Sequence, residues 1–304
     1  MTQIRDPVFA VRHRPVDQIA RFLAAFGLLL LPTIGGCPPD CAQPGQGIVR
    51  SELDFDRLVP LARAALDLTD CNLGLISEET LLQRQRNVGT AQRLRVGNVS
   101  YLFCVSSTPP TQLLALSGTT DIENNRFNLQ TDLVMDETAG GRMHAGYREL
   151  ALAIRGDLLP RLRRDQPVTL VGFSQGGAVA ALLPLWLQSD GITVELVITL
   201  GQPKVTDGGL AGRLALLPLI RFVAADDLIS AYPRLPEYSH FGRSVTLLDG
   251  PFITVLDPGD PGYVDPRELP AELPDFLVLD HGTYDLRLQS KIGTTVCEIP
   301  ATSQ

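Results

Sequence analysis

The sequence predicts an α/β fold in which helices cover both faces of a mostly parallel central sheet. Apolar runs rich in Val, Ile and Leu recur along the chain and are typical of buried strands; three of them begin at Val168, Val194 and Leu219. Segments with helical spacing separate these runs, and strands that alternate with helices favour a parallel sheet. The chain has 304 residues, of which 44% are hydrophobic and 20% charged, enough for one large domain with a full core.

Residues 1–36 are interpreted as a signal peptide of the lipoprotein type. Four arginines precede the apolar run 22–31, which is followed by small residues. A basic start, an apolar stretch of roughly 7–15 residues and a small-residue end are typical of secretory signals. Ile34-Gly35-Gly36-Cys37 resembles the lipobox of bacterial lipoproteins, so we expect Cys37 to be the acylated residue. Residues 37–47, rich in Pro and Gly, are expected to form a tether.

The remaining chain, 48–304, is expected to form the folded domain. Helices are predicted at Leu53–Leu68 and Ser77–Gln92, and core strands at Asn98–Ser106 and Thr111–Leu116. A polar loop is expected at Ile122–Thr131. Further helices are predicted at 148–164, 178–188 and 210–217, with strands at Val194–Leu200 and Leu219–Ala224 between them. The segments 244–248 and 252–256 flank Asp249-Gly250 and predict a hairpin at the edge of the sheet.

The centre of the sequence is VTLVGFSQGG, residues 168–177, where Gly172, Ser174 and Gly176 match G-x-S-x-G. A strand precedes the motif and a helix follows it, the context of a nucleophile elbow. The sharp turn exposes the serine hydroxyl, and side chains at the flanking glycines would collide. The alternative is a glycine-rich turn with an incidental serine.

A serine nucleophile needs a base, and the base needs a carboxylate that orients it. The chain has four histidines, of which His13 and His144 precede the serine. In this fold the base follows the acid, so His240 and His281 are the candidates, and the position of His281 at the end of an apolar run favours it. Asp226 and Asp227 follow the strand 219–224, and spacing does not choose between these two acids.

The tetrahedral intermediate of acyl transfer carries an oxyanion that needs hydrogen-bond donors. The N–H of Gln175, the residue after the nucleophile, is one expected donor. The second should come from a loop after an earlier strand, and Gly118-Thr119 is the candidate.

The chain resembles the class 3 lipases, the family of the fungal triacylglycerol lipases. Stretches that match the family, in its order, include LLALSGTTD, MHAGYRELALAI, VTLVGFSQGGAVAALL, RFVAADDLIS and LDHGTYDL. The resemblance implies an α/β-hydrolase fold for 48–304, with Ser174 as nucleophile, His281 as base and Asp227 as the acid. It also implies that Thr119 contributes its hydroxyl and N–H to the oxyanion hole and that Asp132 is the acid near it.

The sequence departs from the family around the site. The family usually has Arg-Gly-Thr where this chain has Ser117-Gly118-Thr119, and leucine where Gln175 stands. The segment 121–130 matches the family's lid, with Asp121 at its start. Its apolar residues are Ile122, Phe127 and Leu129, and so few predict weak activation at oil surfaces.

The sequence therefore predicts a serine carboxylic-ester hydrolase, a lipase or esterase, that acts on lipid or short-chain acyl esters without a cofactor. The alternative is a non-catalytic lipid-binding lipoprotein of the cell envelope that retains the fold. The protein is expected to be exported, either secreted or anchored to a membrane through acylated Cys37. A net charge of −8 without a basic stripe argues against nucleic acid as a partner. Cys41, Cys71, Cys104 and Cys297 allow three disulfide pairings, and no cysteine or histidine cluster predicts a metal.

Overall fold

In a computed structural model of the chain, contacts divide it into two units, Met1–Pro39 and Asp40–Gln304. The structure describes residues 41, 48–120, 122–224, 227–260, 263 and 282–301, with the backbone alone for 122–124, and all of them belong to the second unit. The predicted signal peptide, Cys37, Asp226 and His281 lie outside the described residues. Within the described part, no helix is both long and apolar enough to cross a membrane.

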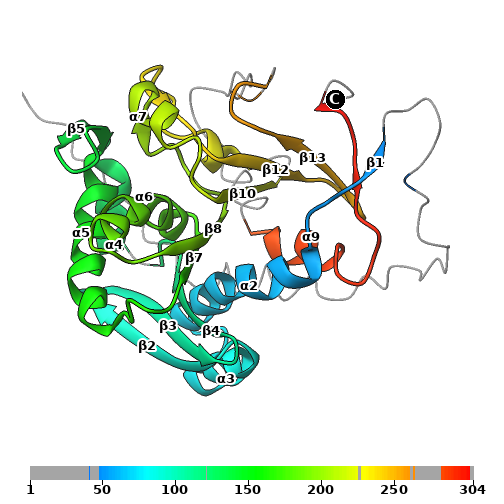
Figure 1. Cartoon of the computed structure of the whole chain (residues 1–304), viewed down its shortest axis with the longest axis horizontal. Coiled ribbons are helices and arrows are strands. Elements are labelled where there is room, and N and C mark those ends of the chain that lie inside the picture. Colours follow the sequence, from blue (N-terminus) through cyan, green and yellow to red (C-terminus); the bar gives the residue numbers. More distant parts are fainter. Residues whose placement is uncertain are drawn as a thin grey trace, which may run out of the picture. The chain divides into compact units, whose positions relative to one another are not determined.

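A ten-stranded sheet runs through the described residues (Figure 1). In spatial order its strands are β1 (Val49–Arg50), β14 (Cys297–Glu298), β13 (Phe252–Leu256), β12 (Arg243–Leu247), β10 (Leu219–Ala224), β8 (Val194–Leu200), β7 (Val168–Phe173), β4 (Pro110–Leu116), β3 (Val99–Ser107) and β2 (Thr90–Val96). The five central strands, from β12 to β4, are parallel, whereas β2, β3 and β4 pair antiparallel. The mostly parallel sheet predicted from the alternating strands and helices is confirmed.

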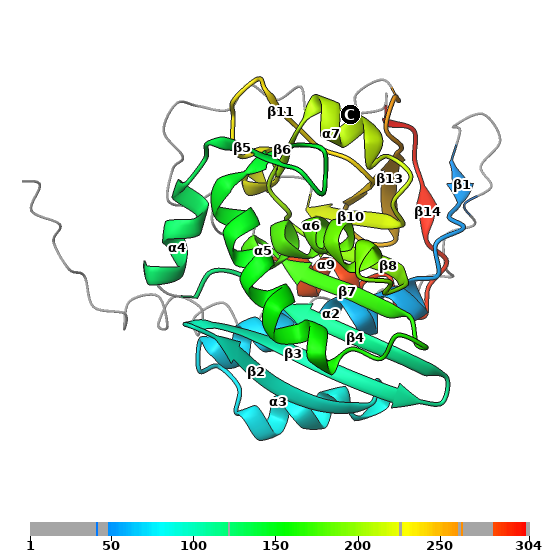
Figure 2. The ribbon, with the colours of Figure 1, turned by 60° about the vertical axis from the view of Figure 1, so that its left-hand side comes forward.

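Helices cover both faces of this sheet (Figure 2). One layer contains α4 (Ile122–Leu129), α5 (Ala145–Leu158), α6 (Gln175–Ser189) and α7 (Gly208–Arg213). The other contains α2 (Phe55–Asn72), α3 (Glu78–Arg84) and α9 (Tyr284–Gln289). Each layer has its own apolar core, because side chains alternate across the strands and so serve both faces. Short 3₁₀ turns lie at Gln85–Asn87, Leu159–Arg161 and Leu228–Ala231.

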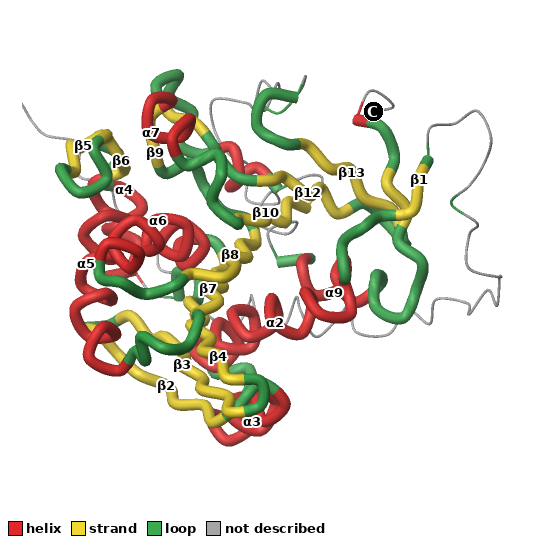
Figure 3. The backbone as a smooth tube through the Cα atoms, viewed as in Figure 1, coloured by secondary structure: helices red, strands yellow, loops and turns green. Residues whose placement is uncertain are grey.

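A second, four-stranded sheet lies apart from the large one (Figure 3). It consists of β11 (Tyr238–Ser239), β9 (Thr206–Asp207), β6 (Gly141–His144) and β5 (Leu133–Asp136). Because β6 leads directly into α5, this small sheet fixes where that helix begins.

Three local predictions were wrong. The helix expected over Ser77–Gln92 ends at Arg84, and Thr90 begins β2 instead. The turn requires Gly89, whose φ is +153° and where a Cβ would lie 2.4 Å from the Val105 oxygen. The hairpin of β12 and β13 is not at the sheet edge, since β14 and β1 extend the sheet beyond it.

The third correction concerns the segment expected to be a polar loop, which contains helix α4. Its Phe127 is 7% exposed and belongs to the core beneath α5. The contact is close, because a Cβ at Gly146 would lie 2.0 Å from the Phe127 carbonyl oxygen. Burial of one aromatic side chain explains why a polar segment folds here as a helix.

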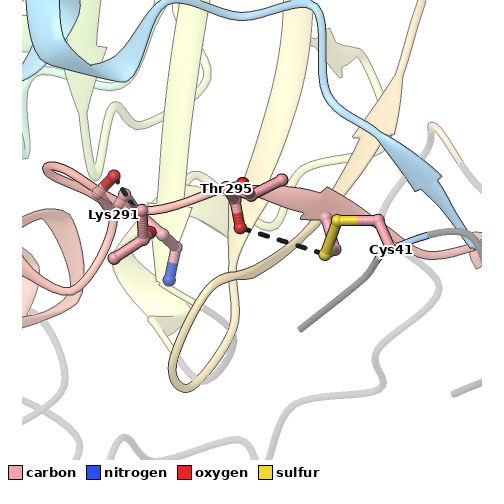
Figure 4. The surroundings of a disulfide bond; sticks show 5 residues. Cys41, Lys291 and Thr295 are labelled. Carbon is pink, nitrogen blue, oxygen red and sulfur yellow. Dashed lines mark hydrogen bonds between the residues drawn. A yellow bond between two sulfur atoms is a disulfide. The ribbon is translucent and has the colours of Figure 1, made fainter. Parts of the chain in front are cut away.

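A disulfide joins Cys41 to Cys297 in β14 (Figure 4). It links residues 256 positions apart, one within the predicted tether 37–47 and one in the sheet. Cys71 and Cys104 are free thiols, and Cys104 is buried, as expected for a core cysteine; burial raises its pKa to about 12.

Candidate active site

Ser174 lies at the abrupt turn between β7 and α6. Apart from glycines, it is the one residue of the described chain with a positive φ, 53°, with ψ at −121°. A side chain in this region is strained by roughly 1–3 kcal/mol, and such strain is concentrated at functional sites. Ser174 is half-buried, and its N–H donates to the Leu200 oxygen at 2.8 Å, which ties the turn to β8.

The two glycines of the motif permit this turn. A Cβ at Gly172 would lie 2.1 Å from the Gly176 oxygen, and a Cβ at Gly176 would lie 2.4 Å from the Leu116 oxygen and 2.5 Å from the Ser117 oxygen. The two glycines therefore allow the first turn of α6 to pack closely against both β7 and the end of β4.

The loop after β4 lies beside the serine. Leu116 pairs with Gly172 in parallel register, so the two strands end at the same edge of the sheet. A Cβ at Gly118 would lie 3.3 Å from the Ser174 Cβ. Ser117-Gly118-Thr119 therefore lies beside Ser174, the place at which the sequence predicts the second oxyanion donor.

Helix α2 supports this loop through two hydrogen bonds. The Gly118 N–H donates to the Thr69 hydroxyl at 3.1 Å, and the Asn72 amide donates to the Ser117 hydroxyl at 2.9 Å. The Gly118 N–H is thereby engaged on the side of α2. Within the pair Gly118-Thr119, Thr119 then remains as the candidate for an oxyanion donor.

Thr119 and Gln175 are connected through α4. The Thr119 hydroxyl accepts a hydrogen bond from Asn128 at 2.9 Å, and the Gln175 side chain donates to the Asn128 carbonyl oxygen at 3.1 Å. Both Asp132 and Thr119 are described, and no hydrogen bond joins them; the Asp132 side chain is exposed at the start of β5. Sequence reasoning missed Asn128 because it lies in the segment interpreted as a polar loop.

Asp227 follows the end of β10 and is 3% exposed. One carboxylate oxygen accepts from the Ile229 N–H at 2.9 Å, and the other accepts from the Tyr284 hydroxyl at 2.6 Å. Tyr284 is fully buried and also accepts from the Ala224 N–H at 3.0 Å. Burial, aided by the charge of Asp227, raises the pKa of Tyr284, so the phenol remains a neutral donor. Tyr284 was missed, although it follows His281 closely in the stretch LDHGTYDL.

The other two histidines after the predicted signal are engaged elsewhere. His144 is fully buried, stacks on Tyr147 at 3.9 Å and caps α5, where its Nδ1 accepts from the Tyr147 N–H at 3.4 Å. Burial lowers the pKa of His144 to about 4. His240 is half-buried with its Nε2 2.6 Å from the Ser230 oxygen, and burial lowers its pKa well below the ordinary value. Both imidazoles are therefore neutral near pH 7.

The residues predicted for the lid differ in exposure. Phe127 is buried beneath α5 and Leu129 is 69% exposed. Asp121 and the side chain of Ile122 lie outside the described residues. Since one of its apolar residues is buried in the core, α4 offers still less apolar surface than its sequence indicates, and weak activation at oil surfaces stays a prediction.

Comparison with known proteins finds similarity to lipases. Residues 113–237 match the sequence model of class 3 lipases. Lipase A of Sodiomyces alcalophilus is 29% identical over 174 residues, which cover 52% of this chain and 39% of that protein. The chain thus spans about two fifths of the length of this curated relative.

Solved structures of fungal lipases share the fold. A Yarrowia lipolytica lipase gives a TM-score of 0.56 at 18% identity, covering 71% of this chain and 89% of that one. A lipase from Rhizopus microsporus var. chinensis gives 0.54 at 18% identity, covering 71% and 85%. The triacylglyceride lipase of Rhizomucor miehei gives 0.53 at 17%, covering 67% and 84%. The fold of the described chain is that of the α/β-hydrolases.

Proposed function

We propose that this chain, whose residues 113–237 match the class 3 lipase family, is a serine carboxylic-ester hydrolase acting on lipid or short-chain acyl esters. The observation that carries the proposal is the strained backbone of Ser174, held between β7 and α6 beside the Thr119 loop. A strained non-glycine residue is retained where its hydroxyl must be presented, and an incidental serine would not need this conformation.

The proposed reaction is acyl transfer through Ser174. Its Oγ attacks the ester carbonyl carbon while His281 takes the hydroxyl proton, and a tetrahedral intermediate forms. His281 then returns the proton to the leaving alcohol as the carbon–oxygen ester bond breaks. Water repeats the sequence on the acyl-enzyme, which releases the acid and restores Ser174.

Asp227 is proposed to orient His281 and to offset its positive charge. Burial of Asp227, with bonds from Tyr284 and the Ile229 N–H, supports this role because both donors hold the carboxylate in one orientation. Asp227 follows β10 at the edge where β7 also ends, which is where catalytic groups gather in such sheets.

The oxyanion is proposed to bind between Gln175 and Thr119. Gln175 opens α6, so its N–H belongs to a first turn whose N–H groups lack acceptors within the helix. Thr119 would add its N–H and hydroxyl. Each such donor typically contributes about 3–4 kcal/mol to transition-state stabilisation.

The protein is further proposed to act outside the cytoplasm, secreted or anchored through Cys37. The disulfide between Cys41 and Cys297 supports export, because such bonds persist in oxidising compartments. The proposed binding partner of the protein is a lipid or small ester substrate.

Labelling with a fluorophosphonate tests the proposal. We expect wild-type protein to be labelled and to hydrolyse nitrophenyl esters, and Ser174→Ala to lose labelling and about 10⁶-fold of kcat. Ser189→Ala, at the exposed far end of the same helix, is the matched control and should keep both. A folded wild-type protein that is neither labelled nor active would contradict the proposal and favour a lipid-binding role. If the protein is active, its rates on nitrophenyl esters of increasing acyl-chain length define the substrate class.

A further inference from the structure

The disulfide lies at the same edge of the large sheet as the proposed catalytic groups. Ala224, the last residue of β10, pairs with Leu247 at the end of β12. Leu247 pairs with Ile253 of β13, and the residue before Ile253 pairs with Cys297. Because β7, β10 and β12 are parallel members of one sheet, their carboxyl ends share this edge. Cys297 therefore lies on the edge that carries the nucleophile turn and the proposed acid.

The disulfide is close to the proposed site without being part of it. In the spatial order of strands, β14 is five positions from β7, the strand that leads to Ser174. Neighbouring strands are about 4.8 Å apart, so Cys297 is about 24 Å from the nucleophile turn across the sheet. At this distance the bridge takes no part in the chemistry, but it can determine what this edge of the sheet faces.

The bridge determines the side from which the N-terminal segment reaches the domain. Strand β14 runs away from the carboxyl edge, since it is parallel to β13 and β13 is antiparallel to β12. Strand β1 runs toward that edge, with Val49 beside Glu298 and Arg50 beside Cys297. The direction of β1 would therefore lead the residues before Val49 toward the opposite edge. The bridge instead holds the Cα of Cys41 5.4 Å from that of Cys297, at the carboxyl edge (Figure 4).

The bridge also shortens the predicted tether. Cys41 follows Cys37, the predicted acylation site, by four residues, whereas Val49 at the start of β1 follows it by twelve. An extended chain spans at most about 3.6 Å per residue, so the bridge reduces the reach of the tether from about 43 Å to about 14 Å. Both cysteines of the bridge are buried, and thiol exchange requires access to a sulfur. The attachment is therefore a permanent one.

Four leucines that are more than half exposed flank the proposed site: Leu73, Leu75, Leu129 and Leu286. Leu73 and Leu75 follow α2, whose last residue donates to the loop after β4. Leu129 ends α4 beside the residue that donates to the same loop. Leu286 belongs to α9, the helix that donates to the proposed acid. Exposed apolar side chains around one site are typical of a surface that binds a membrane.

We propose that the disulfide between Cys41 and Cys297 fastens the predicted lipid anchor to the catalytic edge of the sheet. Ser174 then faces the bilayer that holds the protein and hydrolyses ester lipids of that same membrane by the acyl transfer described above. The inference rests on the proposed function and on acylation of Cys37. A site held at its membrane does not have to find an oil surface, which accords with the few apolar residues of α4.

Removal of the bridge tests the proposal. The full chain, produced with its own signal, is reconstituted in phosphatidylcholine vesicles that contain nitrophenyl palmitate, and its rate is divided by its rate on soluble nitrophenyl acetate. Without the bridge the free segment grows from four residues to twelve, which lowers the effective concentration of the site at the membrane about fivefold. We expect Cys41→Ser combined with Cys297→Ser to lower the ratio of the two rates at least that much, well below the Tm of the variant. Cys71→Ser, which removes a free thiol, is the matched control and should keep the ratio.

An unchanged ratio, whether both rates stay high or fall together, would overturn the inference, because the bridge would then only stabilise the fold. If the variant without the bridge does not fold, the exposed leucines decide. Leu73→Ser combined with Leu75→Ser should lower the ratio at least twofold. Leu216→Ser should keep it, because Leu216 is almost fully exposed but lies just before β10, at the opposite edge of the sheet. Equal ratios for these two leucine variants would overturn the inference.

Two results with wild-type protein separate this inference from the proposed function. Protein that hydrolyses neither ester overturns both together. Active protein whose mass shows no acyl group on Cys37 overturns this inference alone.

Discussion

Replacing Gly176 by alanine perturbs the contact between the nucleophile turn and the Thr119 loop. The added Cβ would lie 2.4 Å from the Leu116 oxygen and 2.5 Å from the Ser117 oxygen, both backbone atoms. A carbon and an oxygen in favourable contact are about 3.3 Å apart, so the start of α6 and the end of β4 must separate by about 0.9 Å.

That separation has two consequences. Overpacking of a tightly packed site costs about 1–3 kcal/mol of unfolding free energy, which lowers Tm by about 2–4 °C per kcal/mol in a domain of this size. The same shift moves Ser174 relative to Thr119, and a misplacement near 1 Å costs about 10²-fold in activity. We therefore expect Gly176→Ala to lose far more activity than its stability loss alone explains.

The assay combines thermal unfolding with hydrolysis of a soluble nitrophenyl ester. Gly156→Ala is the matched control, because Gly156 lies within α5 and a Cβ there meets nothing within 4 Å. It should stabilise the protein by about 0.5–1 kcal/mol without loss of activity. A folded Gly176→Ala protein with wild-type Tm and kcat would refute the reasoning.

Two further predictions concern stability. Reduction of the disulfide, or Cys297→Ser, should lower the free energy of unfolding by about 2–5 kcal/mol, because a bridge between residues 256 positions apart restricts the unfolded chain; equal Tm values with and without reductant would contradict this. Burial lowers the pKa of His144 to about 4, so the unfolded state binds the proton first and stability should fall as pH drops from about 6.5 to 4, by up to about 3 kcal/mol. Asn keeps an acceptor for the Tyr147 N–H, so His144→Asn should flatten the pH dependence of Tm in this window, and an unchanged slope relative to wild type would count against the assignment.

The buried strands were predictable because their signal is local. Val194–Leu200 and Leu219–Ala224 have the predicted bounds, since strands covered on both faces are predominantly apolar. The turn at Ser174 was predictable for the same reason, because its glycines, strand and helix are adjacent in sequence.

The errors arose where distant contacts decide the structure. Strand β2 is polar and half-exposed and forms by pairing with β3, so the sequence predicts a helix that runs three residues into it, to Gln92. The two-residue strands β1 and β14 exist only through their pairing beyond the hairpin. Helix α4 depends on burial of Phe127 beneath α5, which no periodicity in a polar segment indicates.

The support of the candidate site comes largely from outside the segment that matches the lipase family. Thr69 and Asn72 of α2 hold the loop after β4, and Arg93 of β2 donates to Asn72 Oδ1 at 2.7 Å. In the family an arginine usually stands in that loop, at the position of Ser117. Here the guanidinium comes from β2, which β3 separates from β4, and it is linked to the loop through the Asn72 side chain. Residues 113–237 therefore carry the proposed nucleophile and acid, but the position of the oxyanion loop depends on elements that precede them. The chemistry of this chain is thus best regarded as a property of the whole sheet edge, in which local motifs supply the reacting groups and distant elements set the distances between them.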